Sequence, residues 1–509
     1  MLTLAKIFLV ALLGSLLLTP LVRRLALRWG MVDEPDEHRK LHGGAIPLGG
    51  GVAVLGGFAA ALAAAFVYSS RWRERFAADW LFLTGLLAAA GVICFLGYLD
   101  DRHGLRGRQK LLGQLVATTV LVCGGLVIER FTIFGWQIEL GVLAVPFTLF
   151  WLLGATNALN LIDGVDGLAT SVGIVLSLAV SVMSLLAGHQ ADALLAMAVA
   201  GSLAGFLIYN APPASIFLGD AGSMFIGLVL GALAIRSSLK GPATIALAAP
   251  TALLAVPIFD VTMAILRRTL TGRSIYSADR GHLHHRLILR GYGPRSTVLV
   301  IGLLCALTAV GAVFSEYAQN DILAISAILA VVAVLALTRL FGHQEFVLLV
   351  RRAKHFVRSL VPHRGRLGER HGELQTLLQG SPQWVELWHT LIDYAERFDL
   401  SSIQLNVLMP AWGQEYHASW NRKELSADAD LWHSDIPLMA DRITVGRLRI
   451  TGRCCNGSVC TWMADLIAGL KPFETQMLEL IDAEETFEPA ARPPRVVPAT
   501  SGTEVGQPR

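Results

Sequence analysis

The chain has 509 residues, of which 54% are hydrophobic and only 16% are charged. Soluble globular proteins carry roughly 25% charged residues, so this composition excludes an ordinary soluble protein and predicts one embedded in a membrane. A formal net charge of +3 gives no reason to expect a nucleic acid partner.

Apolar runs near or above the length that spans a bilayer, roughly 17–25 residues, recur up to about residue 340. We count eleven: 2–22, 47–68, 80–98, 111–128, 141–157, 168–187, 191–209, 221–235, 243–266, 296–314 and 322–340. The first run has no small-residue cleavage site before its "RRLALR" flank, which favours a retained anchor over a removed signal peptide. The pattern predicts an all-α polytopic membrane protein with about eleven transmembrane helices.

Arginine and lysine in the connections predict the orientation, because cytoplasmic loops carry an excess of both. With the N-terminus outside, the inner loops hold five such residues in 23–40, four in 102–110 and seven in 267–295. The outer loops then hold six, or seven with Lys6. This bias predicts an outside N-terminus and a cytoplasmic C-terminus.

The composition changes after Leu340. Residues 341–371 are basic and amphipathic, which suits either a helix on the anionic inner leaflet or an ordinary surface helix. Residues 372–485 combine helical spacing in "QWVELWHTLIDYAERFD" with strand-like alternation in "SIQLNVLMP", "EYHASW" and "ITVGRLRIT", which predicts a C-terminal cytoplasmic α+β domain of unknown role. Proline-rich residues 486–509 are predicted to be disordered, and residues 1–340 form the membrane-embedded domain.

Five long polar stretches all fall on the predicted cytoplasmic side. They are "VDEPDEHRKLHGGAIPLGGG", "DDRHGLRGRQKLLGQ", "NALNLIDGVDG", "NAPPASIFLGDAGS" and "TGRSIYSADRGHLHHRLILRGYG". Outer loops such as "AGHQAD" contain nothing comparable. Since polar side chains are costly in hydrocarbon, their concentration on one face predicts one shared site.

The residue types in these stretches narrow the chemistry. Five aspartates supply hard oxygen donors: Asp100, Asp101, Asp163, Asp166 and Asp220. No Cys or His cluster has zinc spacing, so the implied metal is Mg²⁺ or Mn²⁺. Cationic and imidazole side chains accompany the aspartates: Arg106, Arg108, Lys110, Arg280, His282, His284 and His285. Such a mixture is typical of a site for a metal-bound phosphorylated substrate.

The helix expected to begin near Asp220 and end near Arg236 has about sixteen residues. At 1.5 Å per residue it would be about 24 Å long, shorter than a hydrocarbon core of about 30 Å. This length favours a helix N-terminus that lies below the membrane surface, although a tilted helix or an earlier start would also explain it.

Six strings, in order, resemble the polyprenyl-phosphate N-acetylhexosamine-1-phosphate transferases, which include undecaprenyl-phosphate N-acetylglucosaminyl-1-phosphate transferase and phospho-N-acetylmuramoyl-pentapeptide transferase. The strings are "DEPDEHRKLHGGAIPLGGG", "LGYLDDRHGLRGRQKLLGQ", "NALNLIDGVDGLA", "FLGDAGS", "PIFD" and "SADRGHLHHRL". The resemblance covers residues 1–340. It implies transfer of a sugar 1-phosphate from a UDP-sugar to polyprenyl phosphate, with UMP released and Mg²⁺ or Mn²⁺ as cofactor, at the cytoplasmic face of a bacterial inner membrane.

The resemblance also implies roles for individual residues. Asn160 and Asp220 are expected to contact the metal. Asp100 and Asp101 are expected to handle the lipid phosphate, and Asp163 to belong to the catalytic carboxylates. The remaining candidates are expected to bind substrate: Lys40, Arg108, Lys110, Asn157, Asp166, Arg280, His282, His284 and His285.

The histidine string bears on the donor. "HLHHRL" resembles the N-acetylglucosaminyl enzymes rather than the His-His-His-x-Glu pattern of the peptidoglycan branch, so UDP-N-acetylglucosamine is favoured. UDP-MurNAc-pentapeptide or another UDP-N-acetylhexosamine is the alternative. A transporter or non-catalytic lipid-binding protein would carry charges near the bilayer midplane, usually with internal repeats, and no clear repeat is present. Membrane lipid and the two substrates are the expected partners, and a homodimer is left open.

Overall fold

The computed structural model describes residues 2–33, 45–241, 244–270, 281–342, 372–379, 383–398, 400–409, 414–422, 431–440, 443–453, 466, 468–471 and 473–477. The chain divides into a helical unit, residues 1–360, and a C-terminal unit, residues 361–509. The predicted basic segment 341–371 lies outside the described residues apart from its first two, and the predicted disordered tail 486–509 lies wholly outside them.

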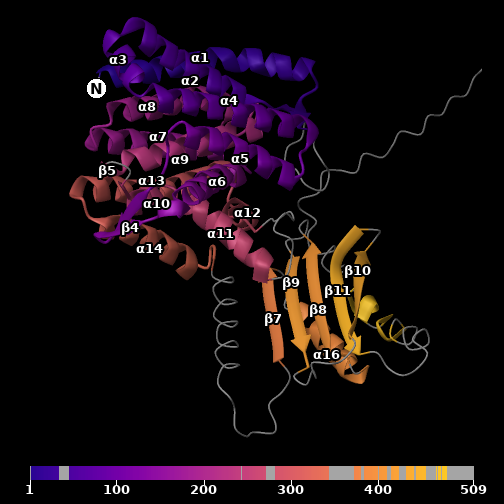
Figure 1. Ribbon diagram of the computed structural model, residues 1–509. Coiled ribbons are helices and arrows are strands. Elements are labelled where there is room, and N and C mark those ends of the chain that lie inside the picture. The colour runs from indigo at the N-terminus through magenta and orange to yellow at the C-terminus, as the bar shows by residue number, and fades with distance from the viewer. Residues whose placement is uncertain are drawn as a thin grey trace, which may run out of the picture. The chain divides into compact units, whose positions relative to one another are not determined.

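The helical unit is a bundle of long helices that run roughly alongside one another (Figure 1). Its helices are α1 (Leu2–Arg28), α2 (Gly50–Tyr68), α3 (Ser70–Ala78), α4 (Trp80–His103), α5 (Gly107–Cys123), α6 (Ala144–Ile162), α7 (Leu168–Leu186), α8 (Gln190–Asn210), α9 (Gly219–Ser237), α10 (Ala248–Leu253), α11 (Ala255–Leu270), α12 (Leu283–Leu289), α13 (Pro294–Ala318) and α14 (Asp321–Leu337).

Eight of the described helices are long and apolar enough to cross a membrane: α1, α2, α4, α6, α7, α8, α9 and α13. The chain is therefore a multi-pass membrane protein. The other predicted runs form shorter helices. Helices α5 and α14 have 17 residues each, and the run at 243–266 is interrupted at Leu254, between α10 and α11.

Helix α9 is the most enclosed of the eight spans and packs against α2, α4, α6 and α7. Small residues allow these close approaches, as is common between membrane helices. A Cβ on Gly97 would lie 2.3 Å from the Ala221 backbone, and one on Gly227 would lie 2.6 Å from the Ala155 carbonyl oxygen. The helix has 19 residues, about 28 Å at 1.5 Å each, so it is close to the hydrocarbon thickness of about 30 Å and most of the expected shortfall is absent. It begins at Gly219, earlier than expected, and ends later, at Ser237.

The connections between helices alternate between the two ends of the bundle. At one end, β1 (Val32–Asp33) pairs with β2 (Ile46–Pro47), close to the ends of α4, α6 and α8. At the other end, β3 (Arg130–Ile133) and β4 (Trp136–Glu139) join β5 (Leu239–Gly241) and β6 (Thr244–Ala246) in a four-stranded sheet. The described parts of the polar stretches therefore gather at the first end.

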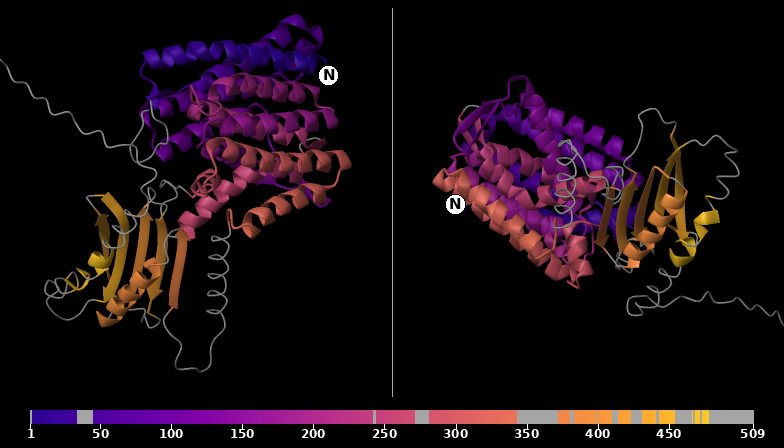
Figure 2. Two further views of the ribbon diagram at one scale, coloured as in Figure 1. Left: turned by 180° about the vertical axis from the view of Figure 1, so that it is seen from behind. Right: turned by 90° about the horizontal axis from the view of Figure 1, so that it is seen from below.

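The C-terminal unit contains a five-stranded antiparallel sheet in the order β10-β11-β8-β9-β7. Its strands are β7 (Gly372–Gln379), β8 (Ser402–Met409), β9 (Gln414–Asn421), β10 (Leu431–Ala440) and β11 (Ile443–Arg453). Helix α16 (Gln383–Arg397) lies against one face of this sheet (Figure 2). Trp384 and Trp388 of this helix are buried in one hydrophobic cluster with Leu405 and Ile450 of the sheet, so this unit has a hydrophobic core of its own.

Candidate functional site

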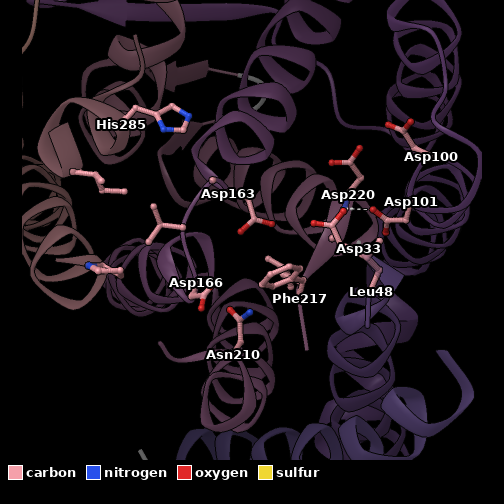
Figure 3. A pocket seen from close by; sticks show the side chains of 16 residues that line it. Asp33, Leu48, Asp100, Asp101, Asp163, Asp166, Asn210, Phe217, Asp220 and His285 are labelled. Carbon is pink, nitrogen blue, oxygen red and sulfur yellow. Dashed lines mark hydrogen bonds between the residues drawn. The ribbon is translucent and has the colours of Figure 1, made fainter. Parts of the chain in front are cut away.

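A cavity of about 510 Å³ lies where α4, α6 and α8 end and α9 begins (Figure 3). Six aspartates line it: Asp33, Asp100, Asp101, Asp163, Asp166 and Asp220. Other lining side chains include Leu48, Asn210, Phe217 and His285. Four polar stretches that are far apart in the sequence thus contribute carboxylates to one cavity.

Asp101 fixes the start of α9. Its carboxylate accepts the backbone N–H groups of Asp220, at 2.8 Å, and Ala221, at 3.4 Å. These are among the N–H groups that a helix leaves without an internal partner. Gly219 has φ of +71°, and a Cβ there would lie 2.5 Å from Asp101 Oδ2, so glycine is needed for this approach. Asp101 therefore places Asp220 in the first turn of α9, as expected from the sequence.

Lys110 is shared between two carboxylates. Its Nζ lies 2.5 Å from Asp220 Oδ2 and 3.0 Å from Asp100 Oδ2. The other oxygen of Asp100 accepts the backbone N–H of Leu105 at 2.7 Å. One ammonium group thus connects the end of α4 and the start of α5 to the start of α9.

The two asparagines of α6 have different surroundings. Asn160 Nδ2 donates to Asp220 Oδ1 at 2.6 Å and to Ser223 Oγ at 2.9 Å. Asn157 instead exchanges hydrogen bonds with the amide of Gln114, at 2.9 and 3.2 Å. Neither asparagine is itself among the cavity-lining residues. Asn160 supports the carboxylate at the site, whereas Asn157 joins α6 to α5.

Asp163 follows the last residue of α6 and points into the cavity (Figure 3). Burial, together with the carboxylates of Asp220, Asp101 and Asp166, raises the pKa of Asp163 well above its ordinary value. Asp166, also in the cavity wall, accepts the Ala214 N–H at 2.8 Å and so ties the turn after α6 to the segment before α9.

The three candidate histidines lie at the start of α12, but only His285 lines the cavity. His284 is 2% exposed and packs on Gly164, where a Cβ would lie 2.2 Å from its Nε2. Burial and the two neighbouring imidazoles hold the pKa of His284 well below its usual range. His282 is also buried, and its Nδ1 lies 2.9 Å from Asp260 Oδ2.

The structure does not bring Arg108 to the cavity. Arg108 is exposed in the first turn of α5 and is not a lining residue. Lys40 and Arg280 lie outside the described residues.

The charge balance of the cavity fits a divalent cation. Asp163 is surrounded by carboxylates, while Lys110 is engaged by Asp100 and Asp220. Carboxylate oxygens that repel one another at a cavity favour a hard cation. Within the described residues no group of three or more His, Cys, Asp or Glu side chains is arranged as a complete metal site. Mg²⁺ commonly takes only one or two carboxylates and completes its shell with waters and substrate phosphates.

Several lining residues were not candidates from the sequence, among them Asp33, Leu48, Asn210 and Phe217. Asn210 accepts a hydrogen bond from Thr170 at 2.7 Å and donates to the Ile216 carbonyl at 3.0 Å. Asp33 and Asn210 stand at or near the borders between apolar runs and the polar stretches. That position could have identified both residues. Leu48 and Phe217 lie in two of the strings that carry the resemblance, but nothing distinguished them from their neighbours there.

A membrane-spanning helix bundle with a carboxylate-lined cavity at one end defines a polytopic membrane protein with a site for a charged ligand. The family model described as "Glycosyl transferase family 4" matches residues 83–238, a segment that runs from α4 to the end of α9 and contains five of the six lining aspartates. The chain belongs to this family.

Curated relatives agree with this assignment. The chain is 37% identical over 313 residues to the "Probable undecaprenyl-phosphate N-acetylglucosaminyl 1-phosphate transferase" of Bacillus subtilis, covering 61% of this chain and 84% of the relative. It is 36% identical to the "Decaprenyl-phosphate N-acetylglucosaminephosphotransferase" of Mycolicibacterium smegmatis, covering 63% and 84%. It is 30% identical to the "Undecaprenyl-phosphate alpha-N-acetylglucosaminyl 1-phosphate transferase" of Escherichia coli, covering 58% and 80%.

Proposed function

We propose that this chain transfers N-acetylglucosamine 1-phosphate from UDP-N-acetylglucosamine to undecaprenyl phosphate, releases UMP, and thereby starts a lipid-linked cell-envelope polysaccharide. The names of the relatives support this reaction, since each aligns over 80% or more of its own length. The observation that carries the proposal is the convergence of Asp100, Asp101, Asp163 and Asp220 at one cavity, with Lys110 paired to two of these carboxylates.

Asp220 and Asp163, with the amide oxygen of Asn160, are the residues that would hold Mg²⁺. When bound, the ion would offset negative charge on the diphosphate of the donor. Asp101 supports this arrangement without being a ligand, because it caps α9 and so fixes the backbone of Asp220. Lys110 keeps Asp100 and Asp220 close together in spite of their like charge.

The acceptor needs little help to become a nucleophile. A phosphate monoester has a second pKa near about 6, so the lipid phosphate is largely ionised at neutral pH. In the proposed step one of its oxygens bonds to the β-phosphorus of the donor, the bond from that phosphorus to the bridging oxygen breaks, and UMP leaves with that oxygen. The larger task is to bring the two anionic substrates together. Lys110 reduces the repulsion between them, and Asp100 positions the acceptor.

The membrane arrangement that fits this reaction has the cavity at the cytoplasmic surface. The arginine and lysine bias of the connections supports an outside N-terminus and a cytoplasmic C-terminal unit. Helices α5 and α14 and the α10–α11 pair would complete eleven passages.

The test uses purified protein in lipid with undecaprenyl phosphate and Mg²⁺. UDP-N-acetylglucosamine, UDP-N-acetylgalactosamine and UDP-MurNAc-pentapeptide are supplied in turn, and the nucleotide product and lipid product are identified. We expect UMP and a lipid diphosphosugar from the first donor. Release of UDP would mean that the sugar moves without its phosphate and would exclude the proposed reaction.

A further inference from the structure

Helix α11 contacts the histidine segment through two buried charged side chains. Asp260 and Arg267 are each 1% exposed. They are seven positions apart, two helical turns, and therefore share one face of α11. Neither belongs to the cavity wall.

Both oxygens of the Asp260 carboxylate are used at the start of α12. Oδ2 lies 2.9 Å from His282 Nδ1, and Oδ1 accepts the backbone N–H of Leu283 at 2.9 Å. A buried carboxylate is costly unless it is hydrogen-bonded, so these contacts are what allow Asp260 to be buried. They place the proton of His282 on Nδ1 and give α12 an N-terminal acceptor supplied by another helix.

Arg267 holds the residue just before this pair. Its Nη2 donates to the Gly281 carbonyl at 3.0 Å. A Cβ on Gly281 would lie 1.6 Å from Arg267 Nη1, so the guanidinium fills the space that any larger residue would need. Residues 281, 282 and 283 are therefore each fixed by α11.

The fixed segment, residues 281–283, determines where the next two histidines, His284 and His285, lie. The rings of His282 and His284 are parallel within 3°, with centroids 5.8 Å apart. The centroids of His284 and His285 are 4.2 Å apart. His284 is wedged against Gly164, directly after Asp163, and neither of its ring nitrogens has a hydrogen-bond partner among the described residues. Packing, rather than hydrogen bonding, holds its ring, so its position depends on the segment that α11 fixes.

We infer that Asp260 and Arg267 are positioning residues that hold His285 at the cavity wall, and that they control the strength of donor binding without touching the donor. This inference rests on the proposed function and on the expectation from the sequence that the histidines bind the nucleotide-sugar donor. It predicts that a change at Asp260 or Arg267 weakens binding of the donor only. The carboxylates and Lys110 on the other side of the cavity keep their contacts, so binding of the lipid acceptor should not change.

Asp260→Asn tests the inference, because it keeps the size of the side chain but removes the charge that faces His282. Asp192→Asn is the matched control. Asp192 is also 1% exposed, and its two carboxylate oxygens accept hydrogen bonds from Arg236 Nε at 2.9 and 3.0 Å. This pair lies at the C-terminal end of α9, away from the cavity at the N-terminal end. Gly281→Ala is a second variant that acts on the same contact through Arg267, and it carries the test if Asp260→Asn does not fold.

The measurements are kcat, the KM for each substrate and the melting temperature. For Asp260→Asn and Gly281→Ala we expect the KM for UDP-N-acetylglucosamine to rise about tenfold or more, in the range found when the supporting contacts of a site residue are removed. The KM for undecaprenyl phosphate should stay within about twofold. Asp192→Asn should lower the melting temperature without this selective rise.

An unchanged donor KM in a folded variant, or equal changes in both KM values, would overturn the inference. So would a selective rise in the Asp192→Asn control. A wild-type protein that releases no UMP would instead refute the proposed function, so the two failures are distinguishable.

Discussion

The two ends of α9 both carry buried charge, but they use it differently. At its C-terminal end, Arg236 donates to both oxygens of Asp192 and to Asp79 at 2.5 Å. The same guanidinium lies 3.8 Å from the ring centroid of Phe82, and His189 contacts the Arg236 carbonyl at 2.8 Å. The charged groups at this end therefore have one another as partners, and their contacts join α4, α8 and α9.

At the N-terminal end of α9, six aspartates line the cavity, and Lys110 is engaged with two of them. Asp163 has mainly other carboxylates as charged neighbours. Buried charges with matched partners stabilise a fold only modestly but are costly to break. Among the described residues that line the cavity, carboxylates outnumber cationic side chains, and such a cavity is suited to a ligand that brings positive charge. The comparison separates a structural end of the helix from a functional one.

The largest effect should come from Asp220→Asn at the functional end. The change keeps size but removes a charge next to Lys110, so we expect turnover to fall by about 10²–10³ and the Mg²⁺ requirement to rise, while the protein still folds. Activity is measured as UMP release during a Mg²⁺ titration, with Asp192→Asn as the matched control. Normal activity of Asp220→Asn at the same Mg²⁺ dependence would show that the metal assignment is wrong.

A change of pH should have a smaller effect than Asp220→Asn, and it should act on the affinity for Mg²⁺. Because the pKa of Asp163 is raised, this carboxyl keeps its proton to a higher pH than an ordinary aspartate. A proton on Asp163 competes with Mg²⁺, so Mg²⁺ affinity should increase as pH rises through the raised pKa. Asp163→Asn removes this competition and should give weaker binding with a flatter pH dependence. The half-saturating Mg²⁺ concentration is measured from mildly acidic to mildly alkaline pH, and equal slopes in the two proteins would contradict the assignment.

Removal of the C-terminal unit should have a smaller effect still. Every described residue of the cavity lies between Asp33 and Pro294, and the C-terminal unit has its own core. A chain that ends at Phe341 should therefore keep measurable transferase activity once inserted in lipid. Complete loss of UMP release by a well-folded truncated chain would show that the C-terminal unit contributes to the reaction.

The smallest effect on turnover is expected at the structural end. Arg236→Met leaves Asp192 buried without its guanidinium partner, and removing one partner of a buried pair costs about 3–5 kcal/mol of stability. The melting temperature should fall clearly, while kcat per folded molecule should stay within about twofold of wild type. A specific loss of kcat without loss of stability would break the distinction between the two ends.

Much of the functional end could be predicted from the sequence, because the alternation of membrane runs decides which loops share a side. That logic places Asp100, Asp101, Asp163 and Asp220 at one end, and the structure brings them to one cavity. It also placed Asp220 at the N-terminus of a helix, and the structure has this residue in the first turn of α9. Polar residues at the ends of apolar runs are a strong signal, since water or a ligand must compensate their burial.

Pairing between side chains was harder to predict. Asn157 and Asn160 are in the same string, and nothing in their spacing indicates that Gln114 engages the first while Asp220 engages the second. Asp260 and Arg267 lie in the ninth apolar run, and their role depends on a contact with residues 281–283 that only tertiary structure reveals. The interruption at Leu254 was also not evident, because the apolar composition continues through it.

The most direct test follows the phosphorus between the two substrates. Wild-type protein, Asp220→Asn and Asp192→Asn are each given undecaprenyl phosphate and UDP-N-acetylglucosamine labelled at the β-phosphorus, and the label is located in the lipid or the nucleotide product. We predict that wild type and Asp192→Asn place the label in the lipid and release unlabelled UMP, while Asp220→Asn transfers almost none. Label retained in released UDP, or equal transfer by Asp220→Asn and wild type, would contradict the assignment of the reaction to the N-terminal end of α9.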